Sequence, residues 1–181
     1  MKVDIVKASR FLSLVLRHNP SKIDLILDEQ GWANVNELLE RMNQRNFNLD
    51  RNDLELIVEK NNKKRFTFSE DGDFIRANQG HSIAIDLALE PIKPPLQLFH
   101  GTATKSVSVI LREGLKKMRR QHVHLSDNMD TAVNVGGRHG KPVVLIVESR
   151  QMYKDGFEFF CSKNGVWLTD RIPAKYIESP Q

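Results

Sequence analysis

Residues 89–96 read Leu-Glu-Pro-Ile-Lys-Pro-Pro-Leu, so three prolines fall in one short segment near the middle of the chain. Proline has no amide hydrogen and a fixed φ, which excludes this segment from a helix interior or a central strand. A chain of 181 residues is also long enough for two small domains. We therefore predict two lobes, residues 1–88 and 96–181, joined by a linker at residues 89–95.

The first lobe contains three helical patterns. Apolar residues recur at helical spacing over residues 5–16, and this helix should end before Pro20, which restricts the residue that precedes it. Asn34 followed three residues later by Glu37 is a capping-box pattern at the start of a second helix. A third helix is predicted to start near residue 50.

A two-stranded hairpin should follow these helices. Residues 65–69 and 74–77 alternate between apolar and polar side chains, and Asp71-Gly72 between them is a strong hairpin-turn signal. Three helices followed by a two-stranded wing resemble a winged-helix domain.

The second lobe changes to a mixture of short strands and helices. Residues 143–147, Val-Val-Leu-Ile-Val, form an apolar run typical of a buried strand. The other elements predicted are strands at residues 98–100, 123–125, 157–161 and 166–168, a helix over residues 106–113 ended by Gly114, and a polar helix after Asp127. Together with the first lobe, this pattern predicts an α+β fold class.

Charge and cysteine content limit the partners and the compartment. The net charge is +4 with clustered basic residues, so an anionic partner such as nucleic acid is consistent with the chain. A single cysteine excludes an intrachain disulfide framework and is typical of a reducing compartment. We find no apolar stretch with the length of a membrane span or the pattern of a secretory signal. We expect a soluble, cytoplasmic monomer that does not associate with membranes.

Guanidinium and imidazole groups gather in four separate stretches. These are Leu-Arg-His at residues 16–18, Lys-Lys-Arg-Phe at 63–66, His-Gly-Thr at 100–102 and Arg-Gln-His-Val-His-Leu-Ser at 120–126. Arginine matches the oxygens of a phosphate bidentately, and a neighbouring histidine can move a proton near neutral pH. Together they indicate a site that holds phosphate. Taken singly, the first stretch is better explained as a solvated helix end and the second as a solvated turn.

Two features that could indicate other ligands carry less weight. His122 and His124 would share one strand face, but zinc would need further ligands, and no Cys-x-x-Cys or His-Glu-x-x-His pattern is present. The glycine-rich residues 136–140 match neither a Walker loop nor a dinucleotide fingerprint, and a mobile surface loop would explain them as well. We expect no metal ion.

Six motifs in order resemble those of the RNA 2'-phosphotransferase family, and the resemblance spans nearly the whole chain. They lie at residues 16–20, 64–66, 100–102, 114–115, 120–126 and 164–169. The family combines an N-terminal winged-helix lobe with a C-terminal ADP-ribosyltransferase-like lobe, and it removes an internal 2'-phosphate from RNA by transferring it to NAD+. The resemblance therefore implies a transferase of tRNA processing. It would form an ADP-ribosylated phosphate intermediate and release nicotinamide and ADP-ribose 1'',2''-cyclic phosphate.

The resemblance assigns the phosphate to four side chains, Arg17, His18, Arg65 and Arg120. We expect the three arginines, which come from both lobes, to converge on one phosphate-sized site. Arg119 is the alternative to Arg120. Arg120 matches the family position two residues before the His-Val-His-Leu run, whereas Arg119 should face solvent.

NAD+ is expected as a co-substrate bound by the second lobe. By resemblance, His100 ends the first strand of the ADP-ribosyltransferase fold and holds the ribose or diphosphate, and His124 lies on the second strand. Val166 stands where many ADP-ribosyltransferases of other classes carry a catalytic glutamate, which a phosphate nucleophile does not need. Glycines and small hydroxyl side chains let backbone groups approach a diphosphate closely. The complete set expected to bind NAD+ is His100, Gly101, Thr102, His124, Ser126, Gly137, Arg138 and Val166.

Two other functions stay open on sequence grounds. One is an ADP-ribosyltransferase that leaves ADP-ribose on a protein or on a nucleic-acid terminal phosphate, using the same C-terminal lobe. The other is a winged-helix DNA-binding regulator whose C-terminal lobe only senses NAD or ADP-ribose. The mixed charges over residues 51–60 count against the regulator, because a recognition helix there would be more basic.

Overall fold

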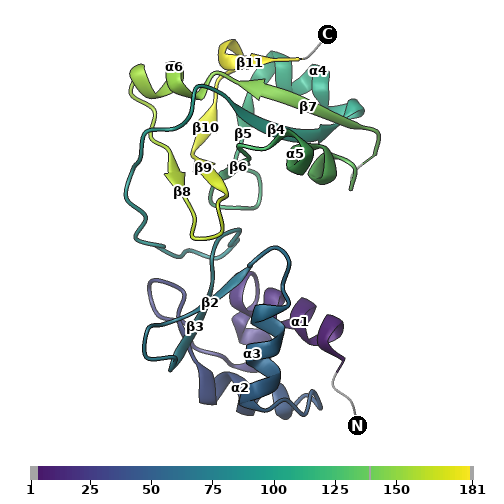
Figure 1. The fold of residues 1–181 in the computed structure, drawn as a ribbon, viewed down its shortest axis with the longest axis vertical. Helices are drawn as coiled ribbons and strands as arrows, with labels where there is room; N and C mark the ends of the chain where they lie inside the picture. The colour runs from purple at the N-terminus through teal and green to yellow at the C-terminus, as the bar shows by residue number, and fades with distance from the viewer. Residues whose placement is uncertain (1–3, 139, 180–181) are drawn as a thin grey trace. The chain divides into compact units, whose positions relative to one another are not determined.

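The computed structural model describes residues 4–138 and 140–179. The chain divides into two compact units, Met1–Ala88 and Leu89–Gln181, and each has its own hydrophobic core. Both units are mixed α/β and contain small antiparallel sheets (Figure 1). Within the described residues, every helix is too short or too polar to cross a membrane.

The first unit packs three helices against a three-stranded antiparallel sheet of order β1-β3-β2. Its core is formed by apolar residues of the helices and of the two longer strands. The elements are α1 (Ile5–Arg17), η1 (Pro20–Ile23), β1 (Ala33–Asn34), α2 (Val35–Asn43), α3 (Arg51–Glu59), β2 (Phe66–Phe68) and β3 (Phe74–Ala77).

Local signals in the sequence set the ends of these elements as predicted. The side chain of Asn34 accepts a hydrogen bond from the backbone N–H of Glu37 at 3.1 Å and so starts α2. Asp50 and Asp53 form a reciprocal capping box at the start of α3. The hairpin pairs β2 with β3, and its turn contains Gly72 at φ 80°, where a residue without a side chain is favoured. The predicted helices and hairpin are confirmed.

The second unit contains two three-stranded antiparallel sheets, β11-β7-β4 and β6-β9-β8, and a short β10-β5 pair. A bridge between Phe99 and Ser126 connects β4 to the end of β6. The elements are β4 (Leu98–Ala103), α4 (Thr104–Glu113), β5 (Leu115–Lys116), β6 (Val123–Leu125), α5 (Met129–Gly136), β7 (Pro142–Val147), α6 (Ser149–Lys154), β8 (Phe160–Cys161), β9 (Trp167–Thr169), β10 (Arg171–Ile172), η2 (Ala174–Tyr176) and β11 (Ile177–Glu178).

The proline-rich segment at residues 89–95 is bonded to the second unit. The backbone N–H of Ile92 donates to the carbonyl of Phe159 at 2.8 Å. Side chains of α6 reach the same segment, because Ser149 Oγ donates to the Pro95 carbonyl at 2.9 Å and Arg150 Nε donates to the Pro94 carbonyl at 2.8 Å. Helix α6 was not predicted, because its six residues are too few to show a repeated helical pattern in the sequence.

The strand predicted at residues 157–161 is shorter in the structure, where β8 comprises only Phe160 and Cys161. The backbone N–H of Phe157 instead donates to the carbonyl of Met152 and closes the end of α6. The chain therefore begins to pair with β9 only after this turn.

Helix α5 packs directly on strand β4, and two glycines make this contact possible (Figure 1). A Cβ atom on Gly101 would overlap the carbonyl oxygen of Ala132 in α5. A Cβ atom on Gly136 would lie 2.6 Å from the carbonyl oxygen of Thr102. Backbone lies against backbone here, so neither position accepts a side chain without movement of the helix.

We predict that Gly136→Ala lowers the free energy of unfolding by roughly 1–3 kcal/mol, because the added methyl group must push α5 away from β4. Gly137→Ala is the matched control. A Cβ there would meet its nearest atom at 3.5 Å, which is an ordinary contact. Chemical denaturation of the two variants beside the wild type checks this, and equal stabilities would contradict the described helix packing.

Candidate functional site

Arg17 and His18 lie at the C-terminal end of α1. Arg17 is the last helical residue and is only 8% exposed, and its Nη1 donates to Ser13 Oγ at 3.3 Å. His18 follows it as the exposed capping residue, and its backbone N–H donates to the carbonyl of Leu14. The helix therefore ends before Pro20, as predicted. The helix thus presents a buried guanidinium and an exposed imidazole at one end.

Arg65 lies directly before β2, in a turn that is tied to α1. The side-chain oxygen of Asn61 accepts from the backbone N–H of Arg65 at 3.3 Å and from its Nη1 at 3.5 Å. The amide nitrogen of Asn61 donates to Ser9 Oγ in α1 at 3.2 Å. Lys64, within this turn, has a left-handed backbone at φ 42°, which costs free energy for a residue with a side chain. Several contacts therefore hold Arg65 in place.

Residues 78–82, which we call the bracing segment, connect these two places within the first unit. The backbone N–H of Asn78 donates to the carbonyl of Arg65 at 2.8 Å, and that of Ser82 donates to the carbonyl of Arg17 at 3.0 Å. A segment of five residues therefore links the backbone of Arg65 to that of Arg17, which directly precedes His18. The bracing segment was not predicted, because its local signal in the sequence is only Gly80 beside a histidine.

His81, within the bracing segment, is a buried imidazole beside positive charges. It is 1% exposed, and among the described residues neither of its ring nitrogens has a hydrogen-bond partner. Burial, together with the charges of Arg17, His18 and Arg76, lowers the pKa of His81 to about 4. The ring is therefore neutral near pH 7 and adds no further charge to this cationic region.

In the second unit, three of the predicted residues meet where β4 approaches β6. The Nδ1–H of His100 donates to the carbonyl of His124 at 3.1 Å, and Ser126 forms the bridge to the residue before His100. Burial lowers the pKa of His100, and the hydrogen bond from its ring only partly opposes this effect. His100 is therefore a neutral imidazole near pH 7, with Nδ1 as its donor.

Thr102 lies on β4 and Val166 lies directly before β9, beside this cluster. Val166 directly precedes Trp167, which pairs with Leu125 in β6. Thr102 is buried in β4, two residues after His100. The cluster therefore combines two imidazoles, of which that of His100 is neutral near pH 7, with hydroxyl groups and an apolar side chain.

The remaining residues predicted to bind NAD+ are Gly101, which is explained by packing, and Gly137 and Arg138, which are exposed. Gly101 is accounted for by the packing of α5 on β4, so close approach to a diphosphate is not needed to explain that glycine. Packing of α5 on β4 also accounts for Gly136, which is a buried residue of α5. The alternative prediction of a mobile surface loop over residues 136–140 is therefore wrong for Gly136. Gly137 and Arg138 are exposed at the end of this helix, and His139 lies outside the described residues.

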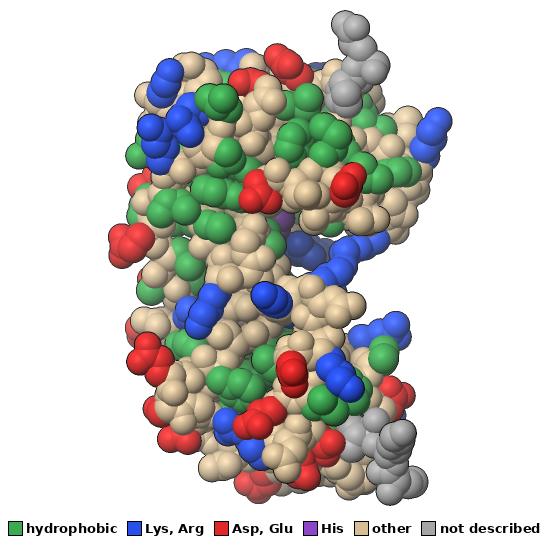
Figure 2. All heavy atoms as spheres, viewed as in Figure 1, with side chains coloured by type: hydrophobic (Ala, Val, Ile, Leu, Met, Phe, Trp, Pro, Cys, Tyr) green, Lys and Arg blue, Asp and Glu red, His purple; other side chains and the backbone are tan. Residues whose placement is uncertain are grey.

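Arg119 and Arg120 lie on the segment between β5 and β6, and both are exposed. Arg119 faces solvent as predicted, but exposure does not distinguish it from Arg120. The neighbouring lysines are paired with carboxylates, Lys116 with Glu113 and Lys117 with Asp170. The basic patch that the sequence shows here is therefore partly neutralised. Basic and acidic side chains are likewise interspersed over the visible face of the first unit (Figure 2).

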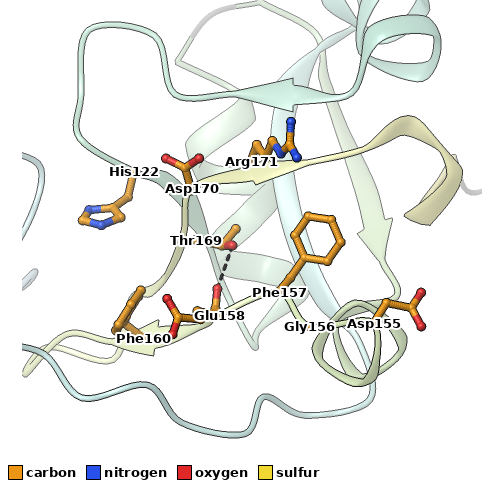
Figure 3. Close-up of a pocket in the computed structure, with 9 residues that line it drawn as sticks. All are labelled: His122, Asp155, Gly156, Phe157, Glu158, Phe160, Thr169, Asp170 and Arg171. Atoms are coloured by element: carbon orange, nitrogen blue, oxygen red, sulfur yellow. Dashed lines mark hydrogen bonds between the residues drawn. The ribbon is translucent and has the colours of Figure 1, made fainter.

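A cavity of about 440 Å³ lies elsewhere in the second unit (Figure 3). Its lining residues are His122, Asp155, Gly156, Phe157, Glu158, Phe160, Thr169, Asp170 and Arg171. None of the residues predicted to bind phosphate or NAD+ is among them. Its three carboxylates would repel a phosphate, so we assign neither substrate to it. Across residues 4–138 and 140–179, no group of three His, Cys, Asp or Glu side chains is placed to hold a metal ion.

Comparisons with known proteins give one family, and each match covers most of the chain. The model of a family described as "RNA 2'-phosphotransferase, Tpt1 / KptA family" matches residues 3–171. A protein of Flavobacterium johnsoniae named "Probable RNA 2'-phosphotransferase" is 55% identical over 179 residues, which is 98% of each chain. A protein of Agrobacterium fabrum with the same name is 56% identical and covers 93% of this chain and 91% of its own.

We predict that the free energy of unfolding falls as the pH drops from about 6.5 towards about 4. The folded state holds His81 neutral with a pKa of about 4, whereas an unfolded chain takes up a proton near the ordinary value of 6.5. The stabilisation is complete above this window and lost below it. Urea denaturation between pH 7 and 5 should show a shallower pH dependence for His81→Gln than for the wild type, and an unchanged slope would contradict the buried neutral ring.

Proposed function

Because the chain belongs to the RNA 2'-phosphotransferase, Tpt1 / KptA family, we propose that it removes an internal 2'-phosphate from RNA by transferring it to NAD+. One structural observation supports this most. The bracing segment holds the positions of Arg17, His18 and Arg65, which are three of the four residues proposed to bind the phosphate. Two positioned guanidinium groups and an imidazole suit a dianionic phosphate.

We further propose that the first unit is a winged-helix lobe and the second an ADP-ribosyltransferase-like lobe. Three helices, a hairpin and the β1-β3-β2 sheet support the first assignment. Two small antiparallel sheets, linked where β4 meets β6, support the second.

The proposed reaction has two steps, with NAD+ as a co-substrate. In the first, an oxygen of the RNA 2'-phosphate attacks C1'' of the nicotinamide ribose, the glycosidic C–N bond breaks, and nicotinamide leaves with the bonding electrons. In the second, the 2''-hydroxyl oxygen of the new adduct attacks phosphorus, and the bond from phosphorus to the RNA 2'-oxygen breaks. The proton lost by the 2''-hydroxyl is balanced by one gained by the RNA 2'-oxygen. ADP-ribose 1'',2''-cyclic phosphate and repaired RNA are released.

In this scheme the arginines and His18 act on the phosphate. Arg17, Arg65 and Arg120 hold its oxygens, and their donors matter most in the second step, when charge is redistributed at phosphorus. His18 supplies or accepts a proton in that step.

The second unit would bind NAD+ mainly through polar side chains. His100, His124, Thr102 and Ser126 offer imidazole and hydroxyl groups to the ribose and diphosphate, and Arg138 offers a positive charge. Val166 stands where many ADP-ribosyltransferases of other classes carry a glutamate, so no carboxylate is present at this position. A carboxylate would repel the incoming phosphate, so its absence from this position suits a phosphate nucleophile.

We predict that Arg65→Ala and His18→Ala accumulate the ADP-ribosylated intermediate, because loss of a positioned donor slows the second step by roughly a hundredfold or more. His100→Ala should instead slow formation of the intermediate. The test is a time course with a 2'-phosphorylated oligonucleotide and NAD+, in which a gel resolves substrate, intermediate and repaired RNA. Slow turnover without intermediate would refute this division. A stable adduct without cyclic phosphate from the wild type would favour an ADP-ribosyltransferase.

A pair of neighbouring variants tests the fourth residue. We predict that Arg120→Ala slows removal of the 2'-phosphate by at least tenfold, whereas Arg119→Ala leaves it within twofold. Both side chains are exposed, so the two substitutions should perturb folding equally little. The reverse ranking in the same assay would assign the phosphate contact to Arg119.

A further inference from the structure

The bracing segment (residues 78–82) is fixed at both of its ends. Its first residue, Asn78, bonds Arg65 through the backbone and donates its side-chain amide to the carbonyl of Lys64 at 2.7 Å. Its last residue, Ser82, bonds the carbonyl of Arg17 through its backbone N–H. The segment therefore has a defined position relative to both parts of the proposed phosphate site.

Gly80 lets the segment pass directly over the guanidinium of Arg17. Its backbone is left-handed at φ 87°, and a Cβ atom there would lie 3.2 Å from Nη2 and 3.3 Å from Cζ of Arg17. A side chain at this position would be strained and would press on the guanidinium. The glycine thus allows the segment to reach the end of α1 without displacing Arg17.

The hydroxyl group of Ser82 lies against the ring of His18. The distance between Ser82 Oγ and His18 Nδ1 is 2.9 Å, which is a hydrogen bond. Because the backbone of Ser82 is itself bonded to Arg17, its hydroxyl group is a fixed point against which the ring is oriented.

We propose that Ser82 is a positioning residue for the second step of the transfer, which holds His18 by Nδ1 so that Nε2 is the nitrogen that exchanges a proton with the reacting phosphate. This inference rests on the proposed function. Ser82 does not contact the phosphate in this scheme. It fixes the direction of the imidazole, in the way that the partner of a histidine nitrogen sets the role of the other nitrogen.

The experiment compares Ser82→Ala, Ser82→Thr and the control Ser21→Ala in the time course with a 2'-phosphorylated oligonucleotide and NAD+. Ser21 is an exposed serine close to the same helix end, but its hydroxyl donates to Asn19 and not to His18. We expect Ser82→Ala to slow consumption of the intermediate by roughly tenfold and to leave its formation unchanged. Ser82→Thr, which keeps the hydroxyl, and Ser21→Ala should both behave like the wild type.

Two results would overturn the positioning role while leaving the proposed function standing. One is consumption of the intermediate by Ser82→Ala at the wild-type rate. The other is equal slowing by Ser82→Ala and Ser82→Thr, which would indicate a structural role. A wild-type protein that leaves the 2'-phosphate in place would overturn both proposals.

A second measurement does not depend on turnover. In nitrogen NMR spectra of the histidine rings, Ser82→Ala should shift the Nδ1 resonance of His18, and Ser82→Thr should restore it. An Nδ1 resonance that is the same in all three proteins would also overturn the positioning role.

Discussion

The first unit's candidate site depends on two backbone hydrogen bonds, from Asn78 to Arg65 and from Ser82 to Arg17. They matter because like charges resist being grouped. Two unit charges 4 Å apart repel by about 4 kcal/mol at an effective dielectric constant of 20. The hydrogen bonds described for these arginines join them to serine, asparagine and backbone groups, and these bonds help to fix their positions.

In the second unit, the candidate site contains a histidine that is held in place and kept neutral. His100 is held by a backbone carbonyl, and burial keeps its ring uncharged. The strands that carry this cluster are positioned by the packing of α5 on β4, where two glycines remove the side chains that would separate them. The cluster therefore depends on a backbone contact made by Gly101 and Thr102, the residues that directly follow His100.

Features that depend on nearby residues could be predicted from the sequence. Asn34 caps α2 through a partner three residues away, and the Asp71-Gly72 turn closes a hairpin between adjacent strands. The predictions of these elements agree with the structure because the residues that determine them are close together in the sequence. The six motifs likewise indicated the family, although the roles of the individual residues stay predictions.

Features that depend on distant residues could not. Nothing in the sequence around Ser82 shows that it bonds a helix end 64 positions away. Gly101 has a sequence context that fits a ligand site equally well, and only the position of α5 shows that packing requires it. In both cases the deciding partner is far along the chain, so it becomes visible only when the fold is known.

The proline-rich segment has a practical consequence for dissecting the chain. A fragment that begins at residue 96, the start of the lobe that the prolines predict, would lose the amide of Ile92 that bonds Phe159 and the carbonyls of Pro94 and Pro95 that bond α6. A fragment that begins at residue 89 keeps these bonds. A fragment for expression of the second unit by itself should therefore start at residue 89. The prolines are then part of the folded unit and not a linker that can be removed.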